Sequence, residues 1–545
     1  MPDRSSSPPI HQGSPHANID ISSGNPGISR SDGLATTIGL LDVVDDTIPP
    51  THIFRTLVLC FDGTGDQFDS DNSNIVQLFS MLKKDDPAQQ MVYYQAGIGT
   101  YNTTQVATPS GTKLSKTIDM MVGKHLDSHV MGRAPPVSPS SFYTIANGHA
   151  FSVLQMYERV TDEAGDKICL FGFSRGAYTA RALAGMLHKV GLLPRCNHQQ
   201  VPFAYKMYSR DDETGWKQSR AFKKAFSIDV DVEFVGVWDT VSSVGIIPRT
   251  LPFTRANNKI RYFRHALSLD ERRARFLPNF YHRSTEVDNA LGIQKGEMPM
   301  SCKKLHHFHF TRHEKGSMNG HPHEDILRAL EHRYSQSFNE TDVEEVWFSG
   351  CHCDVGGGSV ENGTRYSLAR IPLRWMIREI FKANIGILFH SSMFHEIGLD
   401  PETLYPHVLK RPEAIYGDAP EVDCNEELGP EKPVIQCDPN GTFVNEEYED
   451  LSDALSPTYD QLRIAPHWWV LEVLPQKHQF QKEDGTWHKK LLFNKGRGRR
   501  IPQQDLKGVQ IKVHRTVKIR MEADGLLGGK YWPKAKLKIE PLWVD

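Results

Sequence analysis

The segment from Lys167 to Leu193 constrains the fold more than any other part of this 545-residue chain. It opens with Lys167-Ile-Cys-Leu-Phe, an apolar run that is typical of a buried parallel strand. The run passes directly into Gly172-Phe-Ser-Arg-Gly176, and a stretch rich in small residues follows, which predicts a helix from Ala177 to Leu193. A strand, a tight glycine turn and a helix in immediate succession place Ser174 at the carboxyl end of a strand.

Four further apolar runs predict strands of the same kind, and each ends in Gly, Asp, Ser or His residues. These runs begin at Arg55, Met91, Val232 and Glu345. A second clear helix is predicted from Ser367 to Ala383. Strands that alternate with helices predict an α/β fold, in which a mostly parallel sheet is covered by helices on both faces. Ligands bind such sheets outside the carboxyl ends of the strands, where these polar residues gather.

The Gly-x-Ser-x-Gly turn in this context predicts a nucleophile elbow, which favours an α/β-hydrolase fold over a plain turn with a capping serine. A serine hydroxyl needs a histidine to remove its proton and an acid to orient that histidine. α/β-Hydrolases supply these groups in the chain order Ser, acid, His. Asp239 and His352 follow later strands in that order, so we predict Ser174, Asp239 and His352 as the catalytic residues.

The acid and the base have alternatives that the sequence leaves open. Asp354 lies two residues after His352 and is the alternative acid, while His514 and His265 are the alternative bases. The chain contains 25 histidines, so only a position at the end of a strand singles one out.

Two backbone segments are candidates for an oxyanion hole. The N–H of Arg175 directly follows the predicted nucleophile, and the turn that contains Gly63 ends the first strand. The same turn is equally consistent with Asp62 bonding the local backbone. No cofactor or metal is expected, because neither Cys351-His-Cys-Asp354 nor the histidines of 306–313 have the pair spacing of structural zinc sites.

Composition argues against several other classes of protein. A formal net charge of −3 provides no basic field for nucleic acid, so any contact with lipid would be local. No run of 18 apolar residues occurs, and the N-terminal sequence has no apolar stretch typical of a secretory signal, which predicts a soluble cytoplasmic protein. Cys60 and Cys169 lie within apolar runs and are expected to be core thiols.

Three regions are predicted along the chain. Residues 1–52 are rich in Ser, Pro and Gly and predict a disordered tail. Residues 53–385 carry the strands and motifs and form the predicted catalytic domain. Residues 386–545 are predicted to be an extension packed on that domain. Residues 133–149 are interpreted as a surface insertion, with an error in the gene model as the alternative.

Several sequence blocks together resemble the catalytic domain of class-one type VI secretion phospholipase effectors, a family with many fungal members. The matching blocks are Cys60-FDGTGD, Phe171-GFSRGAYTARALAGMLHKVGLLP, Val235-GVWDTV, His265-ALSLDERR and Val346-WFSGCHCDVGGG. The resemblance implies an α/β-hydrolase fold and, in the secreted bacterial members, phospholipase activity. It also implies a catalytic triad at Ser174, Asp239 and His352.

The sequence thus predicts a serine hydrolase that cleaves ester bonds by acyl transfer, with lipid or phospholipid esters as the substrate class. The alternative is a catalytically idle α/β-hydrolase scaffold that binds a partner. Its aromatic anchors would be Trp468-Trp469 and Tyr531-Trp532, although such residues belong more often to a buried core.

Overall fold

The computed structural model describes ten stretches of the chain. They are residues 46–50, 54–97, 166–194, 197–241, 251–281, 341–417, 443–481, 487–502, 510–526 and 529–545, without the single positions 65, 252, 255, 256 and 538. The predicted insertion at 133–149, the histidines of 306–313 and residues 1–45 of the predicted tail lie outside the described residues. Residues Asp46–Asp545 form one compact unit.

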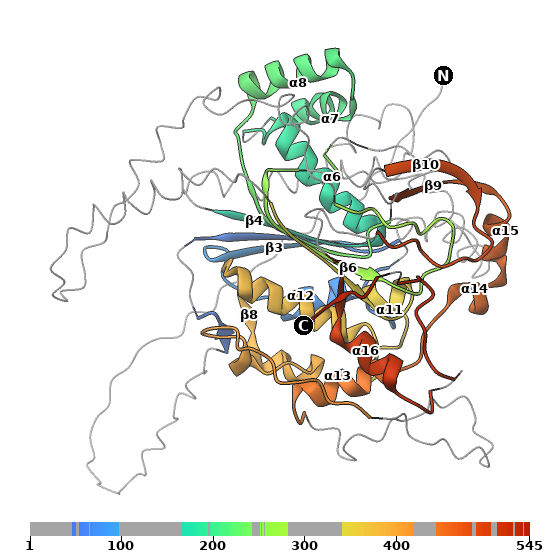
Figure 1. The fold of residues 1–545 in the computed structure, drawn as a ribbon. Coiled ribbons are helices and arrows are strands. Elements are labelled where there is room, and N and C mark those ends of the chain that lie inside the picture. The colour runs from blue at the N-terminus through green and yellow to red at the C-terminus, as the bar shows by residue number, and fades with distance from the viewer. Residues whose placement is uncertain are drawn as a thin grey trace, which may run out of the picture. The chain divides into compact units, whose positions relative to one another are not determined.

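An eight-stranded sheet runs through this unit, with the strand order β12-β11-β7-β6-β5-β4-β2-β3 (Figure 1). All of its neighbouring strands are paired in parallel. The strands are β2 (Thr56–Phe61), β3 (Gln90–Gln95), β4 (Lys167–Phe173), β5 (Val232–Trp238), β6 (Ile260–Ser268), β7 (Asp342–Phe348), β11 (Lys512–His514) and β12 (Leu542–Val544). The predicted parallel α/β fold is confirmed, and β6, β11 and β12 join the five predicted strands.

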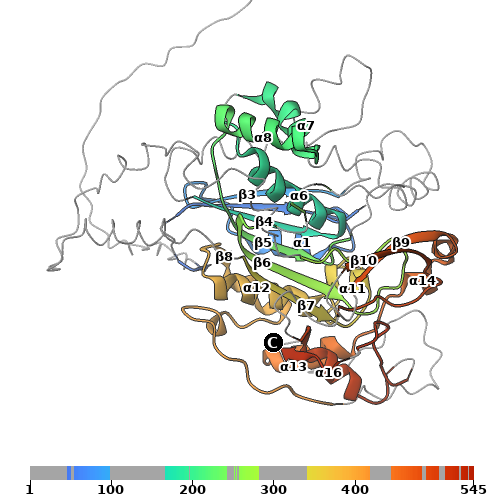
Figure 2. The ribbon, with the colours of Figure 1, turned by 45° about the horizontal axis from the view of Figure 1, so that its top comes forward.

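Helices cover both faces of the sheet (Figures 1 and 2). One face carries α6 (Ser174–Val190), α7 (Val201–Ser209) and α8 (Glu213–Phe226). The other face carries α1 (Asn74–Met81), α11 (His352–Gly356) and α12 (Arg370–Ala383). Beyond α12, helix α13 (Glu446–Leu455) packs against α16 (Arg515–Glu522). The two predicted helices are α6 and α12, with starts that differ by three residues from the predicted ones.

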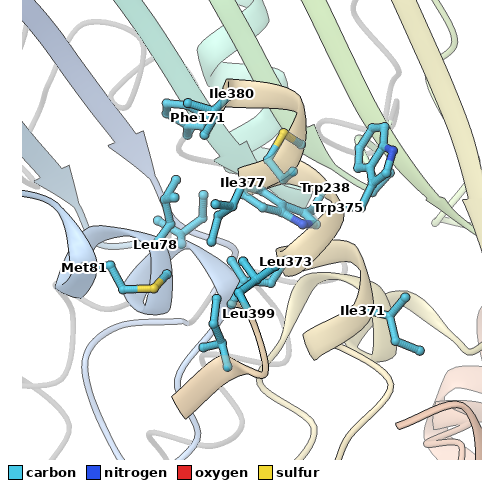
Figure 3. Close-up of a cluster of buried hydrophobic side chains, with 14 of the residues drawn as sticks. Leu78, Met81, Phe171, Trp238, Ile371, Leu373, Trp375, Ile377, Ile380 and Leu399 are labelled. Carbon is cyan, nitrogen blue, oxygen red and sulfur yellow. The ribbon is translucent and has the colours of Figure 1, made fainter. Parts of the chain in front are cut away.

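Two hydrophobic cores form because successive side chains of a strand point to opposite faces of the sheet. In β2, Val58 and Cys60 pack toward α1 and α12, while Leu57 and Leu59 pack toward α6. Figure 3 shows the first of these cores. Its labelled residues come from α1, β4, β5, α12 and the segment after it: Leu78, Met81, Phe171, Trp238, Ile371, Leu373, Trp375, Ile377, Ile380 and Leu399. Each fully buried side chain of this size contributes about 1.5–3 kcal/mol.

The predicted core thiols are confirmed for Cys60 and Cys169. Both side chains are fully buried and free, and burial raises the pKa of each thiol.

The segment from α14 to β10 lies at the carboxyl edge of the sheet (Figure 2). It comprises α14 (Gln461–Ile464), the 3-10 turn η7 (Pro466–Trp468), α15 (Trp469–Glu472) and the hairpin of β9 (Pro475–Gln481) and β10 (Trp487–Phe493). Trp468 and Leu462 pack there against Phe276, a residue that follows β6. At the other end of the sheet, β1 (Thr47–Ile48) pairs with β8 (Phe389–His390). Within the part of the chain that the structure describes, no helix is long and apolar enough to cross a membrane.

Candidate active site

Ser174 occupies a strained turn between β4 and α6. Its φ is 58°, a left-handed conformation that a residue with a side chain seldom adopts. The flanking glycines permit this turn, because a Cβ at Gly172 would lie 2.6 Å from the Cα of Ala177 and a Cβ at Gly176 would clash with the carbonyl oxygen of Phe61. The hydroxyl is therefore presented at the carboxyl edge of the sheet, at the position where the sequence predicts a nucleophile elbow.

His352 begins the short helix α11, directly after β7. Gly350, with φ of 99°, turns the chain there, and the carboxylate of Asp354 accepts the N–H of Cys351 at 2.8 Å to cap the helix. The imidazole lies between two aromatic rings: its centroid is 4.7 Å from that of Phe173 and 4.8 Å from that of Phe276. These rings bury His352 and fix the plane of its side chain.

A chain of hydrogen bonds joins Ser174, His352 and Asp239. The Nε2 atom of His352 lies 2.8 Å from Ser174 Oγ, and its Nδ1 atom lies 2.5 Å from Asp239 Oδ2. An ionised carboxylate can only accept, so Nδ1 carries the proton and Nε2 is left to accept the serine hydroxyl. Asp239 itself follows β5 with φ of 41°, a second left-handed residue in the site.

The protonation states suit a base that is neutral near pH 7. Burial opposes the ionisation of Asp239, but the charge of Arg499 and the contacts of His352 hold the pKa of this carboxyl well below its usual range. Burial also lowers the pKa of His352, against the opposing effect of Asp239. The imidazole is therefore unprotonated at neutral pH and able to accept a proton.

The structure places the alternative candidates elsewhere. Asp354 accepts backbone N–H groups of Cys351 and Tyr459, and burial raises the pKa of its carboxyl to about 7. His265 uses both ring nitrogens, since Nε2 accepts the N–H of Thr240 at 3.0 Å and Nδ1 lies 2.9 Å from a Glu345 oxygen. Asp354 is therefore not the carboxylate that bonds His352, and His265 is not the histidine that bonds Ser174.

His514 ends β11 and caps α16, where its Nδ1 lies 2.9 Å from the Thr516 hydroxyl. The charged side chains around it belong to a buried cluster of arginines and carboxylates that includes Asp450. This histidine therefore has the strand-end position expected of a base but different partners.

The predicted oxyanion residues lie on adjoining segments. The Nε of Arg175 donates to the hydroxyl of Thr64, which ties the start of α6 to the turn after β2. The N–H of Gly63 donates to Asp62 Oδ1 at 2.8 Å, so Asp62 does bond the local backbone. The same carboxylate accepts the hydroxyls of Ser73 and Tyr94. An oxyanion role for Gly63 and Arg175 remains a prediction.

The residue that sequence reasoning missed at this site is Arg499. Its guanidinium donates from Nη1 to Asp239 Oδ1 at 2.5 Å and from Nη2 to Asp239 Oδ2 at 2.9 Å. It comes from the turn after β10, 260 residues beyond its partner. An arginine in the string Lys495-Gly-Arg-Gly-Arg499 has no sequence signature that separates it from a solvent-exposed one.

Comparison with known proteins matches this chain to a family model and to a yeast protein. The family model described as "T6SS, Phospholipase effector Tle1-like, catalytic domain" matches residues 55–133 and 140–379, and the skipped residues lie inside the predicted insertion. The uncharacterized protein YEL023C of Saccharomyces cerevisiae is 26% identical, over 86% of this chain and 79% of the yeast protein.

Two solved structures align more weakly. An uncharacterized protein from Pseudomonas aeruginosa is 16% identical over 61% of this chain and 46% of its own, with a TM-score of 0.28. A Tle1 effector bound to the VgrG spike of the type 6 secretion system is 15% identical over 58% of this chain and 53% of its own, with a TM-score of 0.25. This chain thus spans about half the length of those proteins.

Proposed function

The chain belongs to the family of Tle1-like phospholipase effector catalytic domains, and on that premise we propose that it is a serine hydrolase that cleaves lipid esters by acyl transfer. The observation that carries the proposal is the hydrogen-bonded chain from Ser174 through His352 to Asp239. We also propose that residues 53–385 form the catalytic region and that residues 386–545 form an extension of it.

The reaction follows from the atoms in contact. His352 Nε2 takes the hydroxyl proton as Ser174 Oγ attacks the ester carbonyl, and the imidazolium then returns that proton to the departing alcohol. Water then attacks the acyl-enzyme while His352 accepts its proton. The imidazolium returns that proton to Ser174 Oγ, and the carboxylic acid is released. Asp239 stays ionised throughout and stabilises the imidazolium. Backbone N–H groups at Arg175 and in the Gly63 turn are proposed to bind the oxyanion. The reaction requires no cofactor.

An exposed apolar surface beside the site favours lipid over small soluble esters. We call it the apolar surface. It consists of large hydrophobic residues of α14, α15, β10 and the residues next to α15, each between 42% and 64% exposed: Ile464, Trp469, Val470, Val473, Leu474, Leu491 and Phe493. Trp468, within this segment, packs edge-on against Phe276 at 5.5 Å, and Phe276 contacts His352. Exposed apolar groups that lie together mark sites of contact with membranes or proteins.

The charges around the apolar surface fit an anionic lipid layer. Arg463, Lys490 and Lys495 are exposed on the same segment. The two described carboxylates nearby are engaged, since Asp460 pairs with Arg272 and Glu472 is buried. Aromatic and aliphatic side chains with basic residues beside them are typical of proteins that lie on a membrane surface.

A fluorophosphonate probe tests the chemistry. Wild-type protein is expected to be labelled at Ser174, and Ser174→Ala is expected to abolish labelling. Ser219→Ala is the matched control, because Ser219 is also a buried serine of a helix, and its hydroxyl bonds only the local Trp216 carbonyl. Absence of labelling in a folded wild-type protein would refute the hydrolase and leave the idle scaffold.

Vesicles test the substrate class. Val470→Glu with Val473→Glu is expected to abolish binding to, and hydrolysis of, vesicles of phosphatidylcholine and phosphatidylserine, while turnover of a soluble short-chain ester persists. The control pair, Leu409→Glu with Leu542→Glu, changes two exposed leucines outside the apolar surface and is expected to leave both activities intact. Equal vesicle activity in the two double variants would exclude a role for the apolar surface.

A further inference from the structure

The carboxylate of Asp239 is shared between an imidazole and a guanidinium. Arg499 donates to both of its oxygens, at 2.5 and 2.9 Å, and this bidentate pairing is the one in which arginine binds carboxylate most specifically. His352 reaches the same Oδ2 atom that Arg499 Nη2 contacts, while the N–H of Ser268 reaches Oδ1 at 3.0 Å. Each carboxylate oxygen therefore accepts from two donors, and Asp239 is fully buried.

Contacts other than those with Asp239 hold the guanidinium in place. Arg499 Nε and Nη2 donate to the carbonyl oxygen of Phe276, at 3.1 and 2.5 Å. Nη1 donates to the carbonyl and hydroxyl oxygens of Ser268, at 3.0 and 3.2 Å. The side chain is only 2% exposed. A group with this many other partners can orient the carboxylate instead of merely following it.

The turn that contains Arg499 is held in place by hydrogen bonds to a buried carboxylate. The buried carboxylate of Glu472 accepts the N–H of Gly496 at 2.9 Å and the side-chain amide of Asn494 at 2.6 Å. It also accepts the N–H of Ala274, which joins the turn to the segment that contains Phe276. Gly498 lets the chain pass against the carbonyl of Lys534, where a Cβ would clash.

We propose that Arg499 is a positioning residue of the active site, which holds the carboxylate of Asp239 in the orientation that keeps His352 aimed at Ser174. This inference rests on the proposed serine hydrolase function. Arg499 touches no reacting atom, so it acts through Asp239. The extension of residues 386–545 thereby supplies a part of the catalytic machinery of residues 53–385.

The same contact tunes the base. The charge of Arg499 offsets the charge of Asp239, and this weakens the stabilisation that Asp239 gives to a protonated His352. Two other charged groups face His352: Arg273 and Glu271, which are paired with each other at 2.9 Å and oppose one another in their effect on the imidazole. Loss of Arg499 alone would therefore raise the pKa of His352.

The test compares Arg499→Gln and Arg499→Lys in the full chain, with kcat/KM for a soluble short-chain ester measured across pH. Arg499→Gln is expected to lower kcat roughly 10- to 100-fold, a fraction of the ~10⁴-fold loss that follows removal of a triad carboxylate, with KM little changed. The acid limb of its kcat/KM profile against pH is expected to move to higher pH. Arg499→Lys keeps the charge but not the paired contacts, so its limb should stay near that of the wild type while kcat falls.

Two controls separate this role from simple structural loss. Arg497→Gln removes the same charge from an exposed position of the same turn, and Arg264→Gln breaks another buried pair, with Glu379 at 2.6 Å. Neither is expected to move the acid limb.

The possible outcomes are distinct. If Arg499→Gln folds and keeps the wild-type kcat and acid limb, the inference is wrong. Should that variant fail to fold, Arg499→Lys decides, because unchanged kcat in that variant equally overturns the inference. A wild-type protein without ester turnover or probe labelling would instead remove the proposed function on which the inference rests.

Discussion

Two histidines lie at the carboxyl ends of neighbouring strands of the sheet and differ in what surrounds them. His352 follows β7, and His514 ends β11, the strand paired with β7. Both are buried, and burial lowers the pKa of both, to about 3 for His514. Yet His352 lies between a serine and a carboxylate, whereas His514 bonds Thr516 and stacks on Phe348 at 5.0 Å.

The surroundings of His514 explain its different part in the protein. Beside it, α12 and α13 exchange buried ion pairs, such as Arg374 with Asp450 at 2.6 Å. Arg411 contacts the same carboxylate at 2.8 Å. A buried cluster of this kind holds helices together, because its members lose much if any partner is removed. The comparison teaches that a strand-end position brings a histidine near the edge of the sheet, while its partners decide its chemistry.

The largest expected effect separates the two histidines directly. His352→Gln is expected to reduce kcat for an ester substrate about 10⁶-fold, as removal of a triad base does elsewhere. His514→Gln is expected to change kcat by less than about threefold in the folded protein, since it contacts no reacting group. Steady-state kinetics on both variants checks this, and a catalytic collapse in His514→Gln alone would reverse the assignment.

The two carboxylates that flank these histidines sharpen the contrast. Asp239→Asn is expected to lower kcat about 10⁴-fold, because an amide donor at this position favours the wrong imidazole tautomer. Asp450→Asn is expected to destabilise the fold by about 3–5 kcal/mol by leaving buried arginines without their carboxylate, at little cost in kcat. Denaturant unfolding and kinetics on the same samples distinguish them; similar losses of kcat in both would contradict the contrast.

The burial of His514 is expected to make the stability of the protein depend on pH. Because the folded-state pKa of His514 is depressed to about 3, the unfolded chain binds an extra proton between that value and the ordinary pKa of histidine. The contribution of neutral His514 to the free energy of unfolding is complete above pH 6.5. As the pH falls below that value, the free energy of unfolding decreases by up to about 1.4 kcal/mol per pH unit. Replacing His514 with Gln should flatten the slope of unfolding free energy between pH 4 and 6, measured with urea. An unchanged slope would mean that His514 is not buried in its neutral form.

The smallest expected effects come from the rings that contact each imidazole. Phe276→Leu removes an edge contact to His352 and is expected to lower kcat only a few-fold, roughly threefold to tenfold, through looser positioning. Phe348→Leu removes the ring stacked on His514 and is expected to cost about 1 kcal/mol of stability with kcat unchanged. Thermal unfolding and kinetics on the pair test this, and exchange of the two effects would contradict it.

The strands that the sequence predicts most clearly are those with uninterrupted apolar runs, such as β2 and β4. Strand β6 escapes prediction because Arg261, Arg264 and His265 interrupt its pattern. Two of these polar groups are buried only because distant partners satisfy them, namely Glu379 for Arg264 and Glu345 for His265. Strands β11 and β12 have three residues each, too few for a period of two to stand out.

The turn at Ser174 and the sheet edge where polar residues gather can both be predicted from the amino-acid sequence. Both follow from local chemistry: glycines allow the strained turn, and alternating strands and helices bring strand ends to one edge. Which histidine lies beside Ser174 and which cation binds Asp239 depends on how distant parts of the chain pack together. Those contacts join side chains 178 and 260 residues apart. A local sequence pattern cannot predict them, because the partners come together only when distant segments pack.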